Sequence, residues 1–64
     1  MIKLKDFLRL YASNSAWVVV HMGESRFQFP SRESALAGLP VIWLGKIVIY
    51  FDLDEGVLTV YVEE

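Results

Sequence analysis

The sequence has 64 residues, enough for one domain and too few for a second. It contains no cysteine, which excludes disulfide bonds and thiolate-bound zinc as sources of stability. Eight acidic and six basic residues give a net charge of −2, too balanced to attract a nucleic acid or an anionic membrane through long-range fields. Hydrophobic residues make up 55% of the chain, above the ordinary range of about 45 to 50%. A chain this short needs such a core, or self-association, to be stable.

The apolar stretches are too short and too interrupted to span a membrane. The longest, residues 39–51, contains Pro40 and Lys46 and falls below the roughly 20 residues that a membrane-spanning helix needs. Near the N-terminus, Asp6 and Arg9 interrupt the apolar region that a signal peptide requires. We therefore expect a soluble, cytoplasmic protein.

The first half of the chain predicts a helix followed by a β-hairpin. Apolar residues recur at helical spacing over about residues 3–12, and a polar segment at 13–15 favours a turn. Residues 16–22 contain a β-branched run, and residues 26–29 alternate strictly between apolar and polar. The two stretches predict strands joined by a short loop that contains Gly23.

A second short helix is predicted over about residues 31–38. Pro30 ends the preceding strand, and Ser31 is well placed to cap the helix N-terminus. Glu33 lies in the first turn, where the helix dipole favours negative charge. Gly38 and the proline that follows it predict the end of the helix.

Residues 41–44 leave two interpretations open. They form either a strand that turns at Gly45 and Lys46 into the next strand, or an irregular apolar bridge that packs Trp43 under the sheet. We favour the bridge.

A second hairpin closes the chain and completes the predicted fold. Residues 47–53 and 57–62 are β-branched and aromatic, and the segment 54–56 between them is a strong turn signal. The element order is therefore α-β-β-α-β-β. It predicts an α+β fold in which two short helices pack on one face of a four-stranded antiparallel sheet.

Alternate residues of a strand point to opposite sides of a sheet, so the predicted strands sort into two faces. The predicted core face is uniformly apolar: Val18, Val20, Phe27, Phe29, Ile47, Ile49, Phe51, Leu58, Val60 and Val62. The predicted solvent face carries few charges: Trp17, Val19, His21, Arg26, Gln28, Val48, Tyr50, Asp52, Val57, Thr59 and Tyr61. An exposed apolar patch of this kind marks an interaction surface. The candidate binding residues are Trp17, His21, Val48, Tyr50 and Tyr61.

No pattern for catalysis, a metal or a cofactor is present in the sequence. His21 is the only histidine, so a transition-metal site would need carboxylates for every other ligand, and an ordinary residue on the sheet is the better interpretation. The run 52–56 resembles the start of a calcium loop but lacks the third oxygen ligand and a bidentate glutamate at the twelfth position. The four glycines are scattered and form no phosphate-binding loop. We expect no enzyme, no metal, no cofactor and no small-molecule ligand.

Aromatic residues on an open sheet face suit two kinds of partner. Trp17, Tyr50 and Tyr61 could stack on unpaired bases, but single-strand binders also need a basic groove, and this face offers Arg26 against Asp52. Aromatic residues with few charges are typical of the centres of protein interfaces. We therefore favour a protein partner, either a foreign protein or a second copy in a homodimer.

Two segments of the chain carry a resemblance to known proteins. With Leu4-Lys5-Asp6-Phe7-Leu8 near its start and residues 54–62 near its end, the chain resembles short uncharacterised proteins of phages and mobile elements in Gram-positive bacteria. The resemblance implies a non-enzymatic accessory role. Some such proteins block host defence, as anti-CRISPR proteins do, and others serve the virion or replication. The resemblance does not choose between them.

Overall fold

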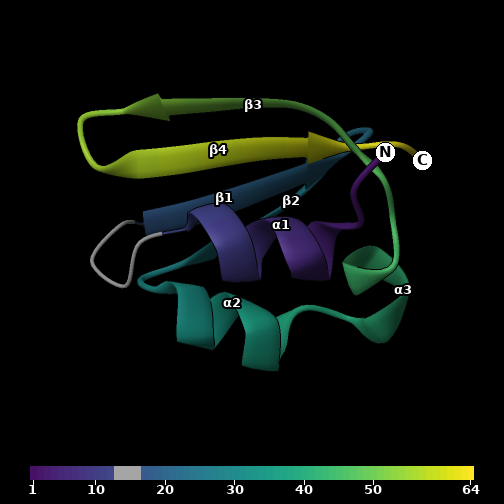
Figure 1. Cartoon of the computed structure of the whole chain (residues 1–64), viewed down its shortest axis with the longest axis horizontal. Helices are drawn as coiled ribbons and strands as arrows, with labels where there is room; N and C mark the ends of the chain where they lie inside the picture. Colours follow the sequence, from purple (N-terminus) through teal and green to yellow (C-terminus); the bar gives the residue numbers. More distant parts are fainter. Residues whose placement is uncertain (13–16) are drawn as a thin grey trace.

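The computed structural model describes residues 1–12 and 17–64 and has an α+β fold (Figure 1). A four-stranded sheet and short helices were both predicted and are confirmed. The predicted turn at 13–15 and the strand start at Ala16 lie outside the described residues. The elements in chain order are α1 (Leu4–Tyr11), β1 (Trp17–Met22), β2 (Ser25–Phe29), α2 (Arg32–Gly38), α3 (Val41–Leu44), β3 (Val48–Asp54) and β4 (Val57–Val62).

The sheet is mixed, so the prediction of a purely antiparallel sheet was wrong. Its strand order is β2-β1-β4-β3, with each hairpin antiparallel and the two central strands, β1 and β4, parallel. After β2 the chain passes through α2 and α3 to the opposite edge of the sheet and enters β3 there (Figure 1). Because this connection is a crossover, the second hairpin lies beside the first in the same orientation, and their inner strands run parallel.

Helix α1 buries the apolar side that its sequence predicts. Leu4, Phe7 and Leu8 are buried, and charged residues lie on the exposed side. Lys3 provides no side-chain cap; instead the Leu4 N–H donates to the Lys46 carbonyl over 2.8 Å. Since the first N–H groups of a helix have no partner within it, this bond anchors the start of α1 to the segment before β3.

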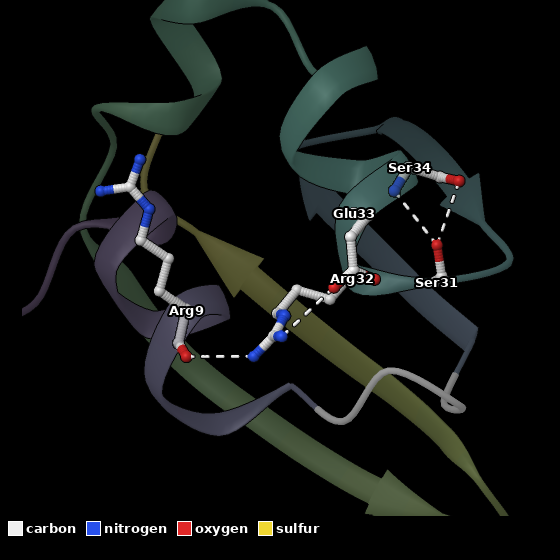
Figure 2. A network of polar contacts seen from close by, with 5 residues as sticks. All are labelled: Arg9, Ser31, Arg32, Glu33 and Ser34. Atoms are coloured by element: carbon white, nitrogen blue, oxygen red, sulfur yellow. Dashed lines mark hydrogen bonds and ion pairs between the residues drawn. The ribbon is translucent and has the colours of Figure 1, made fainter.

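Helix α2 begins at the predicted cap. The Ser31 Oγ accepts a hydrogen bond from the Ser34 N–H over 3.1 Å. Figure 2 shows the Arg32 guanidinium donating to the Arg9 carbonyl over 3.3 Å and pairing with Glu33 over 3.2 Å. That carbonyl belongs to the last turn of α1, where carbonyls lack partners within the helix. Arg32 therefore links the two helices above the sheet.

Residues 41–44 form a helical turn, α3, which neither sequence interpretation included. The favoured interpretation did place Trp43 under the sheet, and Trp43 is buried. The Trp43 and Phe27 rings form a T-shaped pair with centroids 4.9 Å apart. Val41 and Ile42 remain exposed on the same turn. A four-residue helix contains too little periodicity to be recognised in the sequence.

The core lies between α1, α2, α3 and the two central strands. Figure 1 shows the helices on one side of the sheet, and α2 packs on β1 and β2. The buried residues of the core are Leu4, Phe7, Leu8, Ala12, Val18, Val20, Ala35, Leu39, Trp43, Leu58, Val60 and Val62.

The predicted faces hold for β1 and β4 and for Tyr50, Phe51 and Asp52 of β3, but fail at the start of β3. A β-bulge between Val48 and Tyr50 shifts the register with β4, so Val48 lies opposite the buried Val62 and packs against the core. The prediction that Val48 belongs to the solvent face was therefore wrong, because a bulge changes which side the residues before it face. Ile49 and Phe51, predicted in the core, are exposed, and so is much of Phe27. Ile47 lies before β3 and is half-buried.

The predicted hairpin turn after β3 has two residues with positive φ. Glu55 has φ 52° and Gly56 has φ 79° between the paired Asp54 and Val57. Positive φ at both central positions is typical of a type I′ turn, whose twist matches that of the strands. The run 52–56 is thus strand and hairpin turn, as predicted in preference to a calcium loop.

Candidate functional site

The sheet face opposite the helices carries a row of three rings, which we call the aromatic row: His21 on β1, Tyr61 on β4 and Tyr50 on β3. The strand registers place His21 opposite Tyr61 and Tyr61 opposite Tyr50. The His21 and Tyr61 rings stack with centroids 4.6 Å apart and planes at 12°. The Tyr61 and Tyr50 centroids are 5.7 Å apart. The row crosses three strands and therefore forms one continuous surface.

Trp17 lies on the same face as the aromatic row but is separated from it along β1. It is four residues before His21, about 13 Å away in an extended strand. It is 49% exposed, next to Val57 of β4. Of the five predicted binding residues, the structure brings three together, places Trp17 apart on the same face and puts Val48 on the other.

Charge lies at the edges of this face. Arg26 is opposite His21 on β2, and Asp52 and Asp54 are opposite Thr59 and Val57. Between them, the described residues at the centre of the face are aromatic and β-branched and carry no charged group. Such a surface suits contact with an apolar, weakly charged partner surface.

A second apolar surface was missed by sequence reasoning. On the helix side, β3 extends beyond the cover of the helices, and Phe51 and Leu53 are 54% and 63% exposed. The Phe51 ring packs against Phe7 of α1 with centroids 4.9 Å apart, and Phe7 packs against Tyr11 at 5.1 Å. We call this surface, formed by Tyr11, Phe51 and Leu53 around the buried ring of Phe7, the β3 overhang.

The β3 overhang is hollowed. An open depression of about 360 Å³ is lined by Ile2, Phe7, Val48, Ile49, Tyr50 and Phe51. A neighbouring one of about 540 Å³ adds Met1 and Tyr11. The alternation of β3 predicted that Phe51 points towards the helices, and that part is correct. No sequence signal shows that the helices stop short of the strand.

Both surfaces consist mainly of apolar and aromatic side chains. In residues 1–12 and 17–64, no three of the histidine, aspartate and glutamate side chains gather to hold a metal ion. The same part of the chain has no buried polar or charged residue that would form a polar centre in the core. None of its helices is long and apolar enough to cross a membrane.

Comparisons with known proteins add no family to this description. No protein-family model matches the sequence, and neither a curated protein nor a solved structure matches the chain.

Proposed function

We propose that this protein is a non-enzymatic binding protein that occupies one partner protein stoichiometrically through the aromatic row and Trp17. The single observation that carries the proposal is the contact of three aromatic rings, His21 stacked on Tyr61 and Tyr61 tilted against Tyr50, on the sheet face that the helices leave open. Aromatic side chains present a large rigid area at low entropic cost and are enriched in the residues that dominate binding energy.

The electrostatics of the face favour a protein over a nucleic acid. A binder of single strands follows the phosphate backbone with basic residues. Here Arg26 lies opposite His21 at one edge of the aromatic row, and Asp52 and Asp54 lie at the other edge of the face. Phosphates near these carboxylates would be repelled, so the same rings serve a protein surface better.

The proposed biological setting is a phage or mobile element. It depends on the resemblance of the two terminal segments to short accessory proteins of such elements. Within that setting, inhibition of a host defence protein, as by an anti-CRISPR protein, is the role to test first. Steric occupation of a partner needs no catalytic group, which suits a 64-residue chain.

The test is affinity capture from a lysate of Gram-positive bacteria with the wild-type chain and a variant of the face, Trp17→Ser with Tyr50→Ser and Tyr61→Ser. We expect the wild type to retain a protein at a fixed molar ratio, and each central aromatic residue to contribute about 2 kcal/mol or more to binding. The triple variant should therefore lose the partner.

The matched control is Leu53→Ser, which removes an exposed apolar side chain of β3 on the opposite side of the sheet. It should retain the partner. Circular dichroism would establish that all variants fold. Retention by the triple variant, or equal loss with Leu53→Ser, would refute the assignment of the outer face; retention that falls steeply with salt would indicate a nucleic acid.

A further inference from the structure

The two edges of the sheet differ in how they are protected. At one edge, β2 has five residues and is followed by Pro30, and short strands and prolines discourage pairing with another chain. At the other edge, β3 has seven residues, Val48–Asp54, and is largely apolar. Residues 2–4 cover only its start, through the bridge between Lys3 and Ile47. From Ile49 onwards, no described residue pairs with the outer edge of β3.

Apolar side chains flank this open edge on both sides of the sheet. Tyr50 is exposed on the outer face, and Phe51 and Leu53 are exposed in the β3 overhang. A strand added at the edge would pair the free backbone groups and cover these side chains together. The geometry therefore calls for an extended, apolar segment as the occupant.

Strand β3 is itself an extended, apolar segment, and its charges favour antiparallel pairing with β3 of a second copy. Its start lies next to Lys3 and Lys46, and its end carries Asp52, Asp54 and Glu55. In an antiparallel pair, the acidic end of each copy approaches the basic end of the other. A parallel pair would place acid against acid.

The register follows from symmetry. A two-fold axis perpendicular to the sheet keeps each side chain on its own face, so one residue must lie opposite itself. With the axis at Phe51, the midpoint of β3, Asp52 lies opposite Tyr50 of the second copy and Leu53 opposite Ile49. With the axis at Asp52, two carboxylates would face each other, which is unfavourable. With the axis at Phe51, the β3 overhangs of the two copies also lie next to each other and form one surface.

A two-fold dimer of standard size would use a large share of the surface of this chain. A standard interface buries about 800 Å² per partner, roughly one fifth of the 4171 Å² that this chain exposes. Beside the edge of β3, the depression lined by Met1, Ile2, Tyr11 and Phe51 adds further apolar surface to the β3 overhang. Small domains bury a low fraction of their surface, and such a dimer would raise it.

We propose that a second copy of this chain docks antiparallel along the edge of β3 with a two-fold axis at Phe51, forming a continuous eight-stranded sheet. The dimer partly covers Tyr50 but leaves His21 and Tyr61 of both copies open on the same face, so it is compatible with the proposed partner binding and does not depend on it.

The test is the solution mass of the wild type by light scattering across a wide concentration range, together with two variants. Phe51→Asp places two carboxylates opposite each other at the axis and should weaken the dimer by about tenfold or more. Val41→Asp introduces the same charge at an exposed residue of α3 and should leave the dimer unchanged. A wild type that stays monomeric, or a dimer equally stable in both variants, would overturn the proposal.

A second measurement covers the case in which Phe51→Asp fails to fold. The chain has no cysteine, so a single introduced thiol is unambiguous. Residues opposite each other in antiparallel strands have Cα atoms about 4.5 to 5.5 Å apart, within disulfide range. Phe51→Cys should give a covalent dimer on mild oxidation at low concentration, and Glu33→Cys on α2 should not. Equal yields from the two variants would refute the register.

Discussion

Strands β3 and β4 are neighbours in one sheet and have similar sequences, yet they have opposite environments. In β4, Leu58, Val60 and Val62 are buried. In β3, Leu53 lies directly opposite Leu58 and is 63% exposed, whereas Leu58 is 3% exposed. Both leucines point to the helix side of the sheet.

The difference in exposure comes from the position of the helix layer. The helices lie over the central strands, and Figure 1 shows β3 at the edge farthest from α2. A strand pattern states which side a residue faces, and only the helix layer determines whether that side is buried. The helix side of β4 is therefore part of the core and stabilises the fold, whereas the helix side of β3 is exposed and open to contact with a partner.

The largest expected effect tests this comparison directly. Leu58→Ala should lower the free energy of unfolding by about 2 to 5 kcal/mol, because it leaves a cavity in the core. Leu53→Ala should cost under about 1 kcal/mol, since most of that side chain is already in water. Denaturant unfolding followed by tryptophan fluorescence, at a concentration low enough to keep copies apart, measures both. Equal costs would show that the overhang is covered in the single chain.

The turn that joins the two strands gives the next effect. Gly56→Ala should cost about 1 to 2 kcal/mol, because Gly56 has φ 79° and an L-residue is strained there. Among the described residues, no atom beyond the chain neighbours of Gly56 lies within 4 Å of the added Cβ, so the backbone conformation accounts for the expected cost. Gly45→Ala is the control: its φ is −89° and its closest contact would be 3.8 Å, so thermal unfolding should show no loss of stability. A neutral Gly56→Ala would contradict the turn.

Helix α2 covers part of the sheet, and a single substitution can remove its N-terminal cap. Ser31→Ala should lower the free energy of unfolding by about 1 kcal/mol, since the Ser34 N–H loses its acceptor. Ser34→Ala should be nearly neutral, because it loses one hydroxyl contact and gains helix propensity. Chemical denaturation compares the two variants. A Ser34→Ala cost equal to that of Ser31→Ala would locate the stabilisation outside the cap.

The smallest effect is a gain, in the turn beside the exposed strand. Glu55 has φ 52°, which asparagine tolerates better than glutamate. Glu55→Asn should raise the free energy of unfolding by up to about 1 kcal/mol. Glu24→Asn in the turn of the first hairpin is the control, because Glu24 has no positive φ to relieve. A rise in melting temperature for both would show that charge, rather than backbone strain, is responsible.

Local chemistry was predicted well and long-range pairing was not. The cap at Ser31, the two hairpins and the bounds of β4 follow from neighbouring residues, and each is confirmed. The parallel contact of β1 with β4 joins residues about 40 positions apart, and no local pattern encodes it. The aromatic row depends on that contact: His21 and Tyr61 were both named from the sequence, but their stacking needed the register.

The sequence by itself determined which residues are apolar, where the chain turns and which way alternate side chains point, because propensity, capping and periodicity act over a few residues. The tertiary structure decided three things: the order of the strands, the side on which Val48 lies and the exposure of Phe51. The order of the strands depends on pairing between residues far apart in the sequence, and the other two depend on one irregularity and on distant cover. A single bulge inverts the residues before it, and a helix layer that ends before β3 turns residues with a core pattern into surface.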